Sequence, residues 1–392
     1  MAFVLDPALE RFSTPRQWEL LTAWKEHGSQ RKAAEALGVA NNLICQAWAV
    51  VKDKADKCGY SPDGGACHEV ADGYFIKGKS TLYDADGELV LEWVKTGIDQ
   101  ERQQAAMEAA IEGLAGSVKR TKPRKPALKE YSKDLLTGYP IGDHHLGMLS
   151  WAPETGADYD LKIGEELITG AMDHLVDRAM PSDQALIAFL GDYMHFDGYA
   201  ALTPTSGNLL DTDTRFPKIV EAAIRSMRYL IERALDKHRT VHVIVEEGNH
   251  DPASTVFLRA CLANVYENEG RVTIDTSPGL YHYYRFGKAL IGTHHGHKVR
   301  ITKADDLSLI MANDRPKDWA DSEHRFMWTG HIHHDRQGSG RGSKVESFSI
   351  LPPPDAHHSG AGYRSTRGMK SVTFHREHGE YCRHSVNPGM LV

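Results

Sequence analysis

The stretch that decides the fold runs from Val241 to Asp251 and reads Val-His-Val-Ile-Val-Glu-Glu-Gly-Asn-His-Asp. Its β-branched beginning is typical of a short buried strand, and Gly248 permits an abrupt end to that strand. Asn249, His250 and Asp251 are then expected on the loop at the carboxyl end. Open α/β sheets place their functional sites at this edge.

Strand-like and helix-like segments alternate in the chain around this stretch. Strands are predicted at 185–190, 241–245, 289–292 and 326–329, and a closing hairpin is predicted from 372–374 and 381–383 across His378-Gly379. Helices are predicted at 161–180 and 219–235, where apolar residues recur at helical spacing. The alternation begins at about Tyr139 and predicts a layered α/β domain.

Length and composition limit the possible classes of protein. The 392 residues suffice for a catalytic core and a smaller domain, since single cores rarely exceed about 250–300 residues. No apolar run approaches the roughly 20 residues of a membrane helix, and no basic segment precedes an apolar run at the start. We therefore expect a cytoplasmic protein that makes no membrane contact.

The cysteines and histidines give different signals. The five cysteines are odd in number and widely scattered, which favours reduced thiols over a disulfide framework. Cys58, Cys67 and His68 lack a fourth ligand at a recognisable metal-site spacing, so we interpret them as ordinary residues. The 22 histidines are unusual, because imidazole is a common transition-metal ligand and many of them lie in the second half of the chain.

The first sixty residues resemble a helix-turn-helix. Residues 15–57 have a helical pattern, in which Ala34 allows two helices to cross closely and Gly38 can form the turn between them. The core between these helices would be filled by Leu37, Val39 and Ile44. A plain helical hairpin is the alternative, because acidic and basic residues nearly balance here. If the segment binds DNA, base edges would be read by Asn41, Asn42 and Gln46, and phosphates would be held by Arg31 and Lys32.

A connector is expected between this helical domain and the α/β domain. Residues 73–96 read as two strands joined through Asp84-Ala-Asp-Gly, and residues 99–118 read as a helix. The proline-containing, basic run 119–129 reads as a linker that either contacts a phosphate backbone or is a solvated tether. The predicted division is therefore 1–60 for the helical domain, 61–135 for the connector and 136–392 for the α/β domain.

Five short motifs follow strand candidates and combine carboxylate, imidazole and amide groups. They read Asp143-His-His145, Gly191-Asp192-Tyr-Met-His195, Gly248-Asn249-His250-Asp251, Thr293-His-His295-Gly-His297 and Gly330-His331-Ile-His333. These ligand types suit divalent transition metals, and one aspartate can bridge two ions. Each motif alone is common, whereas all five in this order are a specific signal.

In this order the motifs resemble those of the calcineurin-like metallophosphoesterases over roughly 143–333. The resemblance implies a four-layer αββα sandwich. It assigns the first metal to Asp143, His145, Asp192 and His333, and the second to Asp192, Asn249, His295 and His331. It also implies that a metal-activated hydroxide attacks the phosphorus, that His250 protonates the leaving oxygen, and that Asp251 orients the His250 ring.

The doubled histidines need a choice at two positions. The family pattern has one residue between aspartate and histidine in the first motif, which selects His145 over His144. It has histidine directly before glycine in the fourth motif, which selects His295 over His294 and His297. We interpret the unselected histidines as satisfied or surface imidazoles.

The second motif resembles the DNA double-strand-break-repair nuclease branch, because Gly-Asp is followed by two apolar residues and a histidine. That resemblance gives His195 a role in placing the scissile phosphate. The whole arrangement is also similar to phage-encoded metallophosphoesterases with an N-terminal helix-turn-helix. Residues 198–216 are long for a connection and could shape the substrate pocket. Groups around 355–358 and 362–367 could contact phosphate, but the sequence does not place them.

We therefore expect a two-metal phosphodiesterase that acts as a DNA nuclease in the cytoplasm, with a phage-encoded protein in its host as one setting. Manganese is the expected metal, and iron, zinc, nickel and magnesium are alternatives. A small-nucleotide phosphodiesterase is the second interpretation, because the net charge of −7 suits a nuclease poorly. A DNA-binding protein with a non-catalytic metal site is the third. A homodimer is left open.

Overall fold

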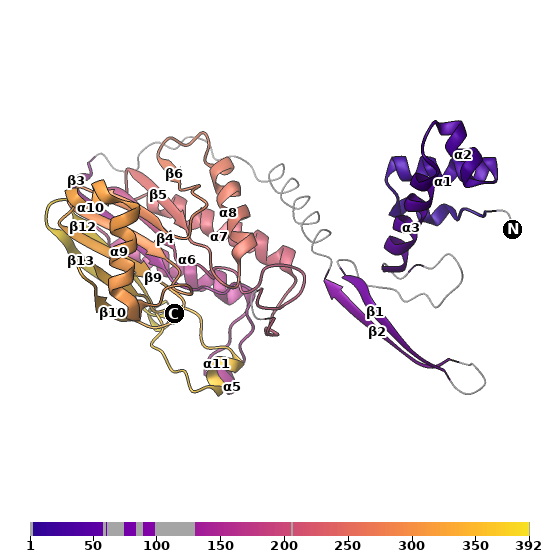
Figure 1. Cartoon of the computed structure of the whole chain (residues 1–392). Coiled ribbons are helices and arrows are strands. Elements are labelled where there is room, and N and C mark those ends of the chain that lie inside the picture. The colour runs from indigo at the N-terminus through magenta and orange to yellow at the C-terminus, as the bar shows by residue number, and fades with distance from the viewer. Residues whose placement is uncertain are drawn as a thin grey trace. The chain divides into compact units, whose positions relative to one another are not determined.

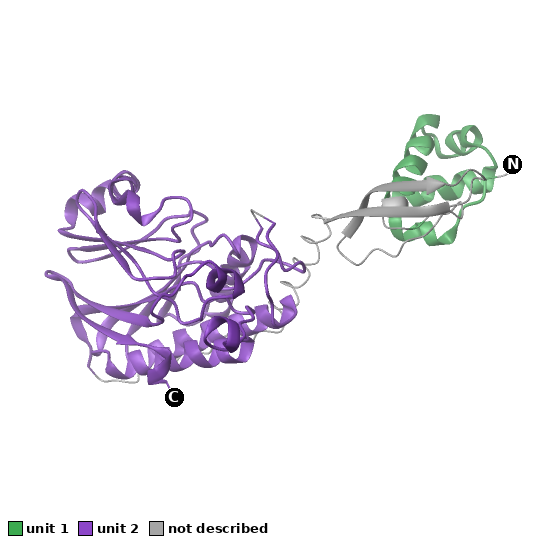
Figure 2. Cartoon of the chain, turned by 90° about the horizontal axis from the view of Figure 1, so that it is seen from below, with its two compact units in different colours: residues 1–109 green, residues 110–392 purple. Residues whose placement is uncertain are grey.

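Residues 3–57, 60, 74–83, 89–98, 130–204 and 207–391 are described by a computed structural model. The chain forms two compact units, residues 1–109 and 110–392 (Figure 2). Outside the described residues lie the predicted helix 99–118, the basic linker 119–129, and Cys58, Cys67 and His68. The three-part division at 60 and 135 stays a prediction. No helix within the described ranges is long and apolar enough to cross a membrane.

The first unit begins with four helices, two of which end at glycines. Its helices are η1 (Pro7–Phe12), α1 (Pro15–His27), α2 (Gln30–Leu37) and α3 (Asn41–Lys57). The side chain of Thr14 caps α1 and that of Ser29 caps α2, each by accepting a backbone N–H from the first turn. Gly28 and Gly38 end α1 and α2 in the left-handed conformation, which glycine adopts without steric cost. The predicted helices and the turn at Gly38 are confirmed.

Apolar side chains from all four helices form the core of the first unit. Leu9, Leu21, Ala33, Ile44 and Val51 have no exposed surface. Leu37 and Val39 pack against this core while partly exposed. A separate antiparallel pair, β1 (Tyr74–Tyr83) and β2 (Leu89–Ile98), confirms the predicted hairpin, although its turn lies outside the described residues.

The second unit contains two mixed β-sheets (Figure 1). The six-stranded sheet has the order β13-β12-β3-β4-β5-β6, with β3 (Ser132–Ile141), β4 (Ser182–Phe189), β5 (Thr240–Val245), β6 (Val272–Ile274), β12 (Met369–His375) and β13 (Gly379–Val386). The five-stranded sheet has the order β10-β11-β9-β8-β7, with β7 (His282–Phe286), β8 (Ala289–His294), β9 (His324–Thr329), β10 (Arg336–Ser339) and β11 (Lys344–Ser347). Strands β3 to β6 run parallel, as do β8 and β9, so their carboxyl ends share an edge.

Helices cover the outer faces of both sheets. The helices are α5 (Ala152–Thr155), α6 (Leu161–Arg178), α7 (Phe216–Leu235), α8 (Pro252–Val265), η2 (Ile301–Lys303), α9 (Ala304–Asp314), α10 (Pro316–Asp321), α11 (Ala356–Gly360) and η3 (Pro388–Met390). Helices α6, α7 and α8 contact strands of the six-stranded sheet, and α9 contacts strands of the five-stranded sheet. The resulting order of helix, sheet, sheet and helix is the predicted αββα sandwich.

Side-chain alternation along the strands builds the two cores of this unit. In β9, Phe326 and Trp328 lie between the sheets, where they meet Leu186 of β4 and Phe374 of β12. Met327 points to the opposite face and packs with the helical layer of α9. Alternate residues of a strand point to opposite faces, so both faces of this buried sheet are apolar.

The predicted strands and helices of this domain are confirmed, while β3, β6, β7, β10 and β11 were not among the predicted strands. Strands β6, β10 and β11 are only three or four residues long, and β10 reads Arg-Gln-Gly-Ser without apolar alternation. Hydrogen bonds to a neighbouring strand maintain such segments, and their own sequence gives little signal.

Candidate metal centre and active site

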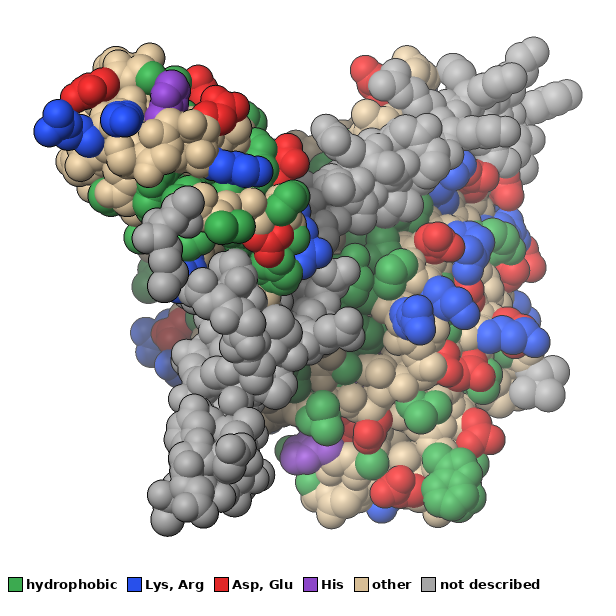
Figure 3. Space-filling view, turned by 90° about the vertical axis from the view of Figure 1, so that its right-hand side faces the viewer, with side chains coloured by type: hydrophobic (Ala, Val, Ile, Leu, Met, Phe, Trp, Pro, Cys, Tyr) green, Lys and Arg blue, Asp and Glu red, His purple; other side chains and the backbone are tan. Residues whose placement is uncertain are grey.

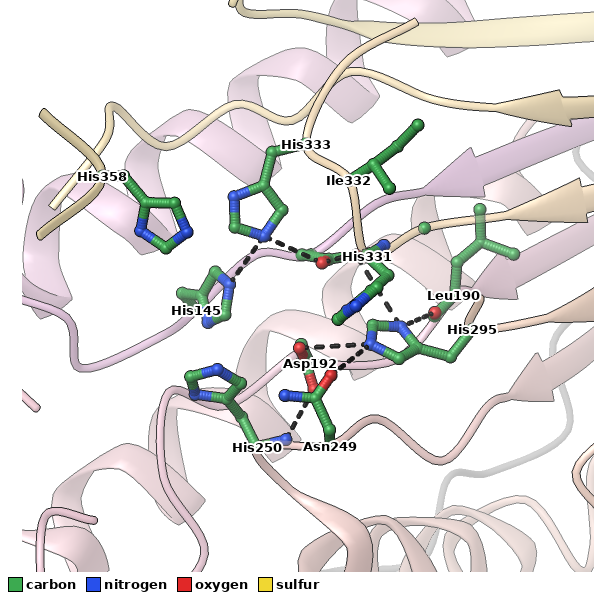
Figure 4. A network of polar contacts seen from close by, with 12 residues as sticks. His145, Leu190, Asp192, Asn249, His250, His295, His331, Ile332, His333 and His358 are labelled. Carbon is green, nitrogen blue, oxygen red and sulfur yellow. Dashed lines mark hydrogen bonds and ion pairs between the residues drawn. The ribbon is translucent and has the colours of Figure 1, made fainter. Parts of the chain in front are cut away.

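The five motifs come together at one edge of the sandwich. Each begins within four residues of a strand end, and the strands concerned are β3, β4, β5, β8 and β9. Because these strands are parallel within their sheets, their carboxyl ends point the motifs to a common site. The predicted ligands approach one another there although they are as far apart in sequence as Asp143 and His333 (Figure 4).

Two of the side-chain groups that could hold a metal ion share Asp143. One consists of Asp143, His145 and His333, and the other of Asp143, Asp192, His295 and His331; within each group the ligand atoms lie within 4.8 Å of one another. The groups contain predicted ligands alone, but the residue that they share is Asp143, whereas the resemblance gave the shared position to Asp192. Asp143 joins both groups, and Asp192 belongs to the second.

In the group of Asp143, His145 and His333, the ligand atoms lie close to one another. His333 Nε2 lies 3.0 Å from Asp143 Oδ2 and 3.2 Å from His145 Nε2. Two imidazole nitrogens that face each other beside a buried carboxylate suit a shared cation, since each nitrogen can offer a lone pair to it.

The second group is oriented by a main-chain contact to His295. The Nδ1 of His295 donates to the carbonyl oxygen of Leu190 at 2.7 Å, which leaves Nε2 free to act as a ligand. That Nε2 lies 3.0 Å from Asn249 Oδ1 and 3.2 Å from Asp192 Oδ2. Of the two alternatives to His295, His294 pairs its Nδ1 with the carbonyl of Leu280 instead. The structure therefore brings His295, as predicted, into the ligand cluster.

The backbone is strained at four of the predicted ligands. Among the described residues, the non-glycine residues with positive φ are His145, Asp192, His331 and His333, at 47°, 49°, 70° and 56°. The left-handed region costs a non-glycine residue about 1–2 kcal/mol. Hydrogen bonds hold these loops: the His331 N–H donates to both oxygens of Asp143 at 3.0 Å, and the His250 N–H donates to Asp192 Oδ1 at 2.8 Å.

Two glycines of the motifs are required by close approach. A Cβ at Gly248 would lie 2.0 Å from Asp192 Oδ1, and a Cβ at Gly330 would lie 2.3 Å from Asp143 Oδ1. Both contacts are with carboxylates of the ligand groups, which cannot move without leaving the cluster. Any larger residue at either position would displace a predicted ligand.

The electrostatics of the site are those of a cation-binding pocket. Burial alone would raise the pKa of Asp192, but the imidazoles of His295, His250 and His145 hold it well below its ordinary value. Burial would lower the pKa of His295, yet the carboxylates of Asp192 and Asp143 raise it to about 10. The buried carboxylates therefore require positive charge close to them, from protons or from metal ions.

The residues present fit a pair of divalent cations. Carboxylate, imidazole and amide oxygen donors occur together, which is the mixture that suits manganese, iron or zinc. Their free ligand atoms converge on the same small volume, and the main-chain contacts described above turn the correct imidazole nitrogens toward it.

His250 lies beside the ligand cluster with one ring nitrogen fixed. Its Nδ1 donates to the carbonyl oxygen of His195 at 2.8 Å, so Nε2 is the nitrogen available to a substrate. The ring centroid is 4.9 Å from that of His145 and 5.6 Å from that of His195. Burial lowers the pKa of His195 to about 3, which keeps this neighbouring ring neutral.

The orienting role predicted for Asp251 needs correction. Its carboxylate accepts the backbone N–H of Asp192 at 3.2 Å and that of Met194 at 3.0 Å, and thus turns away from the His250 ring. Burial, followed by the nearby charge of Asp192, raises its pKa well above the ordinary value. Asp251 fixes the loop after β4, and the carbonyl of His195 orients His250.

The predicted nucleic-acid contacts lie in the first unit. Arg31 and Lys32 on α2, and Asn41, Asn42 and Gln46 on α3, are all exposed. Arg31 is 3.3 Å from Glu35, so part of its charge is compensated locally. The exposure of these side chains is compatible with DNA contact, which stays a prediction.

The sequence did not show where residues 355–367 lie relative to the candidate site, whereas the structure puts several of them beside His333. The ring of His358 lies 5.2 Å from that of His333, and its Nδ1 is 2.7 Å from Asp355 Oδ1 (Figure 4). Arg367 and Tyr363 line the same cavity as His333. Only the density of histidine and arginine in this segment signalled a site. The described residues of 198–216 do not line that cavity, and their predicted role stays untested.

Comparison with known proteins gives matches among solved structures. No family model and no curated protein matches the chain. A Streptococcus pneumoniae TIGR4 structure, described as a conserved uncharacterized protein and predicted phosphoesterase, is 13% identical; the match covers 65% of this chain and 99% of that one, with a TM-score of 0.29. Entamoeba histolytica Vps29 complexed with zinc is 14% identical; the match covers 64% and 98%, with a TM-score of 0.27.

Likenesses at these TM-scores do not carry an argument about family or activity. The four-layer sandwich presents, at the carboxyl ends of its central strands, two overlapping groups of side chains that could hold a metal ion, and His250 lies beside them. This arrangement makes the edge of the sandwich a candidate site for divalent metal ions.

Proposed function

We propose that the protein is a two-metal phosphodiesterase and that its substrate is DNA. The observation that carries the hydrolase proposal is the overlap of the two ligand groups at Asp143, with Asp192 between His295 and His250. A structural metal site would not need a histidine beside the ligands with one ring nitrogen left free. Bound divalent metals would supply Lewis-acid stabilisation of the phosphate and activation of a water molecule.

The chain's own residues supply the remaining chemistry. The His250 Nδ1–H donates to the carbonyl of His195 and so turns Nε2 toward the substrate; when the ring carries a second proton, on Nε2, that proton can pass to the oxygen that leaves the phosphorus. His195, buried and neutral, lies against both His145 and His250 and helps to place the phosphate between them. Gly248 and Gly330 keep the ligand loops close enough for both groups to act on one phosphate.

Support for DNA comes from the first unit. Its helices α2 and α3 are joined at a left-handed glycine, and α3 begins with the exposed Asn41 and Asn42. A helix that presents amide side chains at its start can read base edges in the major groove.

A small-nucleotide substrate is the second candidate, and charge favours it. The protein has a net charge of −7, and acidic and basic side chains are interspersed on the faces seen in Figure 3. A polynucleotide-binding surface more often carries a basic excess.

One substrate panel tests both candidates. The purified protein would be assayed on linear DNA, cyclic nucleotides, nucleoside phosphates and bis(p-nitrophenyl) phosphate, with manganese, magnesium, iron, nickel or zinc. We expect manganese-dependent hydrolysis of DNA and of the generic diester. Hydrolysis of small nucleotides without DNA cleavage would select the second candidate. Absence of hydrolysis with every metal would leave a DNA-binding protein with a non-catalytic metal site.

A further inference from the structure

A cavity adjoins the candidate metal centre on the side of the β9 loop. Its volume is about 450 Å³, and it shares His331 and His333 with the ligand groups. Its far side is formed by residues after β11, including His358 and Arg367. Anything bound in the cavity is therefore next to the reacting phosphate.

The charge of this cavity is of one sign. Arg300, Arg336 and Arg367 line it, and its lining includes no aspartate or glutamate. None of the three has a carboxylate partner within the described part of the chain, whereas Arg383 pairs with Glu346 and Glu380. Arginines that lack an internal counter-ion beside a phosphate-handling centre are free to bind an external anion.

The three arginines differ in how firmly they are held. Arg367 is half-buried and donates its Nε to the carbonyl of Leu351 at 2.7 Å, which fixes one edge of its guanidinium. Arg300 and Arg336 are exposed, at the start of η2 and of β10. The fixed arginine provides a defined anion position, and the two exposed ones can close on the anion from other sides.

We propose that this cavity binds a second phosphate of the substrate, one nucleotide away from the phosphate that is cleaved. The inference rests on the proposed phosphodiesterase function and specifies its substrate class as a nucleotide chain with at least two phosphates. Arg300, Arg336 and Arg367 determine this specificity. A diester with a single phosphate uses the metal centre alone and gains nothing from the cavity.

The test compares substrates that share the reacting bond. Thymidine p-nitrophenyl phosphate carries one phosphate, and the corresponding thymidine dinucleotide esters carry two. Both the 5′ and the 3′ esters are assayed, so that the second phosphate is offered on either side of the reacting phosphate. A methylphosphonate at the second position removes its charge. We expect the charged dinucleotide to have a kcat/KM at least tenfold above that of the other two compounds. In a p-nitrophenyl ester of thymidine diphosphate, the second phosphate is joined directly to the first. Comparing its kcat/KM with that of the dinucleotide therefore distinguishes a site for a nucleotide chain from a site for a nucleoside polyphosphate.

Variants assign the effect to the cavity. In Arg300→Gln/Arg336→Gln the advantage of the charged dinucleotide should fall about tenfold, mainly through KM. Arg341→Gln is the matched control, because Arg341 is an exposed arginine that pairs with Asp305 and does not line the cavity. An unchanged advantage in the double variant, or equal hydrolysis of charged and methylphosphonate substrates by the native protein, would overturn the proposal.

A binding measurement separates this inference from the hydrolase proposal. Thymidine 3′,5′-bisphosphate, titrated calorimetrically into the manganese-loaded protein, should bind at least tenfold more tightly than thymidine 5′-monophosphate, and the double variant should lose this difference. If the native protein shows the difference but hydrolyses no diester, the hydrolase proposal fails and the phosphate site stands. Equal binding of the two nucleotides refutes the phosphate site, whatever the hydrolysis assays give.

Discussion

The buried histidines His238 and His145 of the second unit have chemically different neighbours. His238, between α7 and β5, places Nε2 2.8 Å from the hydroxyl of Tyr139 and Nδ1 2.6 Å from the hydroxyl of Ser182. At the other end of β5, His145 faces His333 through Nε2 and His195 through Nδ1. Each nitrogen of His238 has a neutral hydroxyl partner, whereas those of His145 face other imidazoles.

This difference separates a core histidine from a candidate ligand. Hydroxyl groups can donate or accept, so they satisfy a neutral imidazole without any added ion. Imidazoles that face one another beside buried carboxylates leave lone pairs that only a proton or a cation can satisfy. Burial is the same in both regions, and the chemical identity of the neighbours distinguishes them.

The largest expected effect comes from removing the carboxylate in the ligand cluster. Asp192→Ala should lower kcat on a phosphodiester by about 10³-fold or more, because the variant loses a buried carboxylate of the second ligand group, beside His295. His238→Gln, assayed where it is folded, should retain native kcat. Steady-state kinetics with manganese measure both variants, and an active Asp192→Ala protein would contradict the assignment of this centre.

The acid role of His250 predicts a dependence on the leaving group. His250→Gln should lower hydrolysis of DNA by about 10²-fold, because the alkoxide leaving group needs a proton. The same variant should lose far less activity on a p-nitrophenyl ester, whose leaving group departs without protonation. Equal losses on both substrates would show that His250 binds the phosphate and does not protonate the leaving group.

Metal removal should affect stability through the ligand cluster alone. Chelation should lower the melting temperature of the native protein by several degrees, since a ligand at about 100 times its Kd stabilises by about 2.7 kcal/mol. Manganese should restore it in the native protein and in His238→Gln, but not in Asp192→Ala. Thermal unfolding with and without chelator measures this, and a metal response in Asp192→Ala equal to the native one would refute the cluster as the binding site.

The smallest predicted effect concerns pH and His238. Burial lowers the pKa of His238 to about 3, below the ordinary value of 6.5, so the unfolded chain takes up a proton that the folded protein excludes. Its contribution to stability is therefore complete above pH 6.5 and is lost as the pH falls toward 3, by up to about 1.4 kcal/mol per pH unit. Urea unfolding at pH 7 and pH 5 should show a shallower loss in His238→Gln; an identical loss would mean that His238 is protonated in the folded state.

The sequence predicted the site better than it predicted its surroundings. Motifs such as Gly248-Asn249-His250-Asp251 combine residue type, spacing and a preceding strand, so their meeting at one edge could be anticipated. The partner of the His250 ring could not, because it is a backbone carbonyl and carries no side-chain signature. The phosphate cavity combines Arg300, Arg336 and Arg367 from three separate segments, which only the tertiary fold brings together.

The fold was predictable to a similar degree. Long apolar segments such as α7 and β4 have a clear period, and they were identified within a few residues. Strand β10 depends on pairing with β11 and has no period of its own. Strand β3 was not predicted either, although most of its residues are buried, because Gly138 and Pro140 interrupt its apolar run.

The left-handed backbone at His145, Asp192, His331 and His333 has an evolutionary consequence. Glycine at any of these positions would relieve local strain, so random substitution under selection for folding alone would favour its appearance there. All four positions nevertheless carry side chains with metal-binding atoms. The fold therefore gives up local stability at these four positions in exchange for side chains that glycine would not supply.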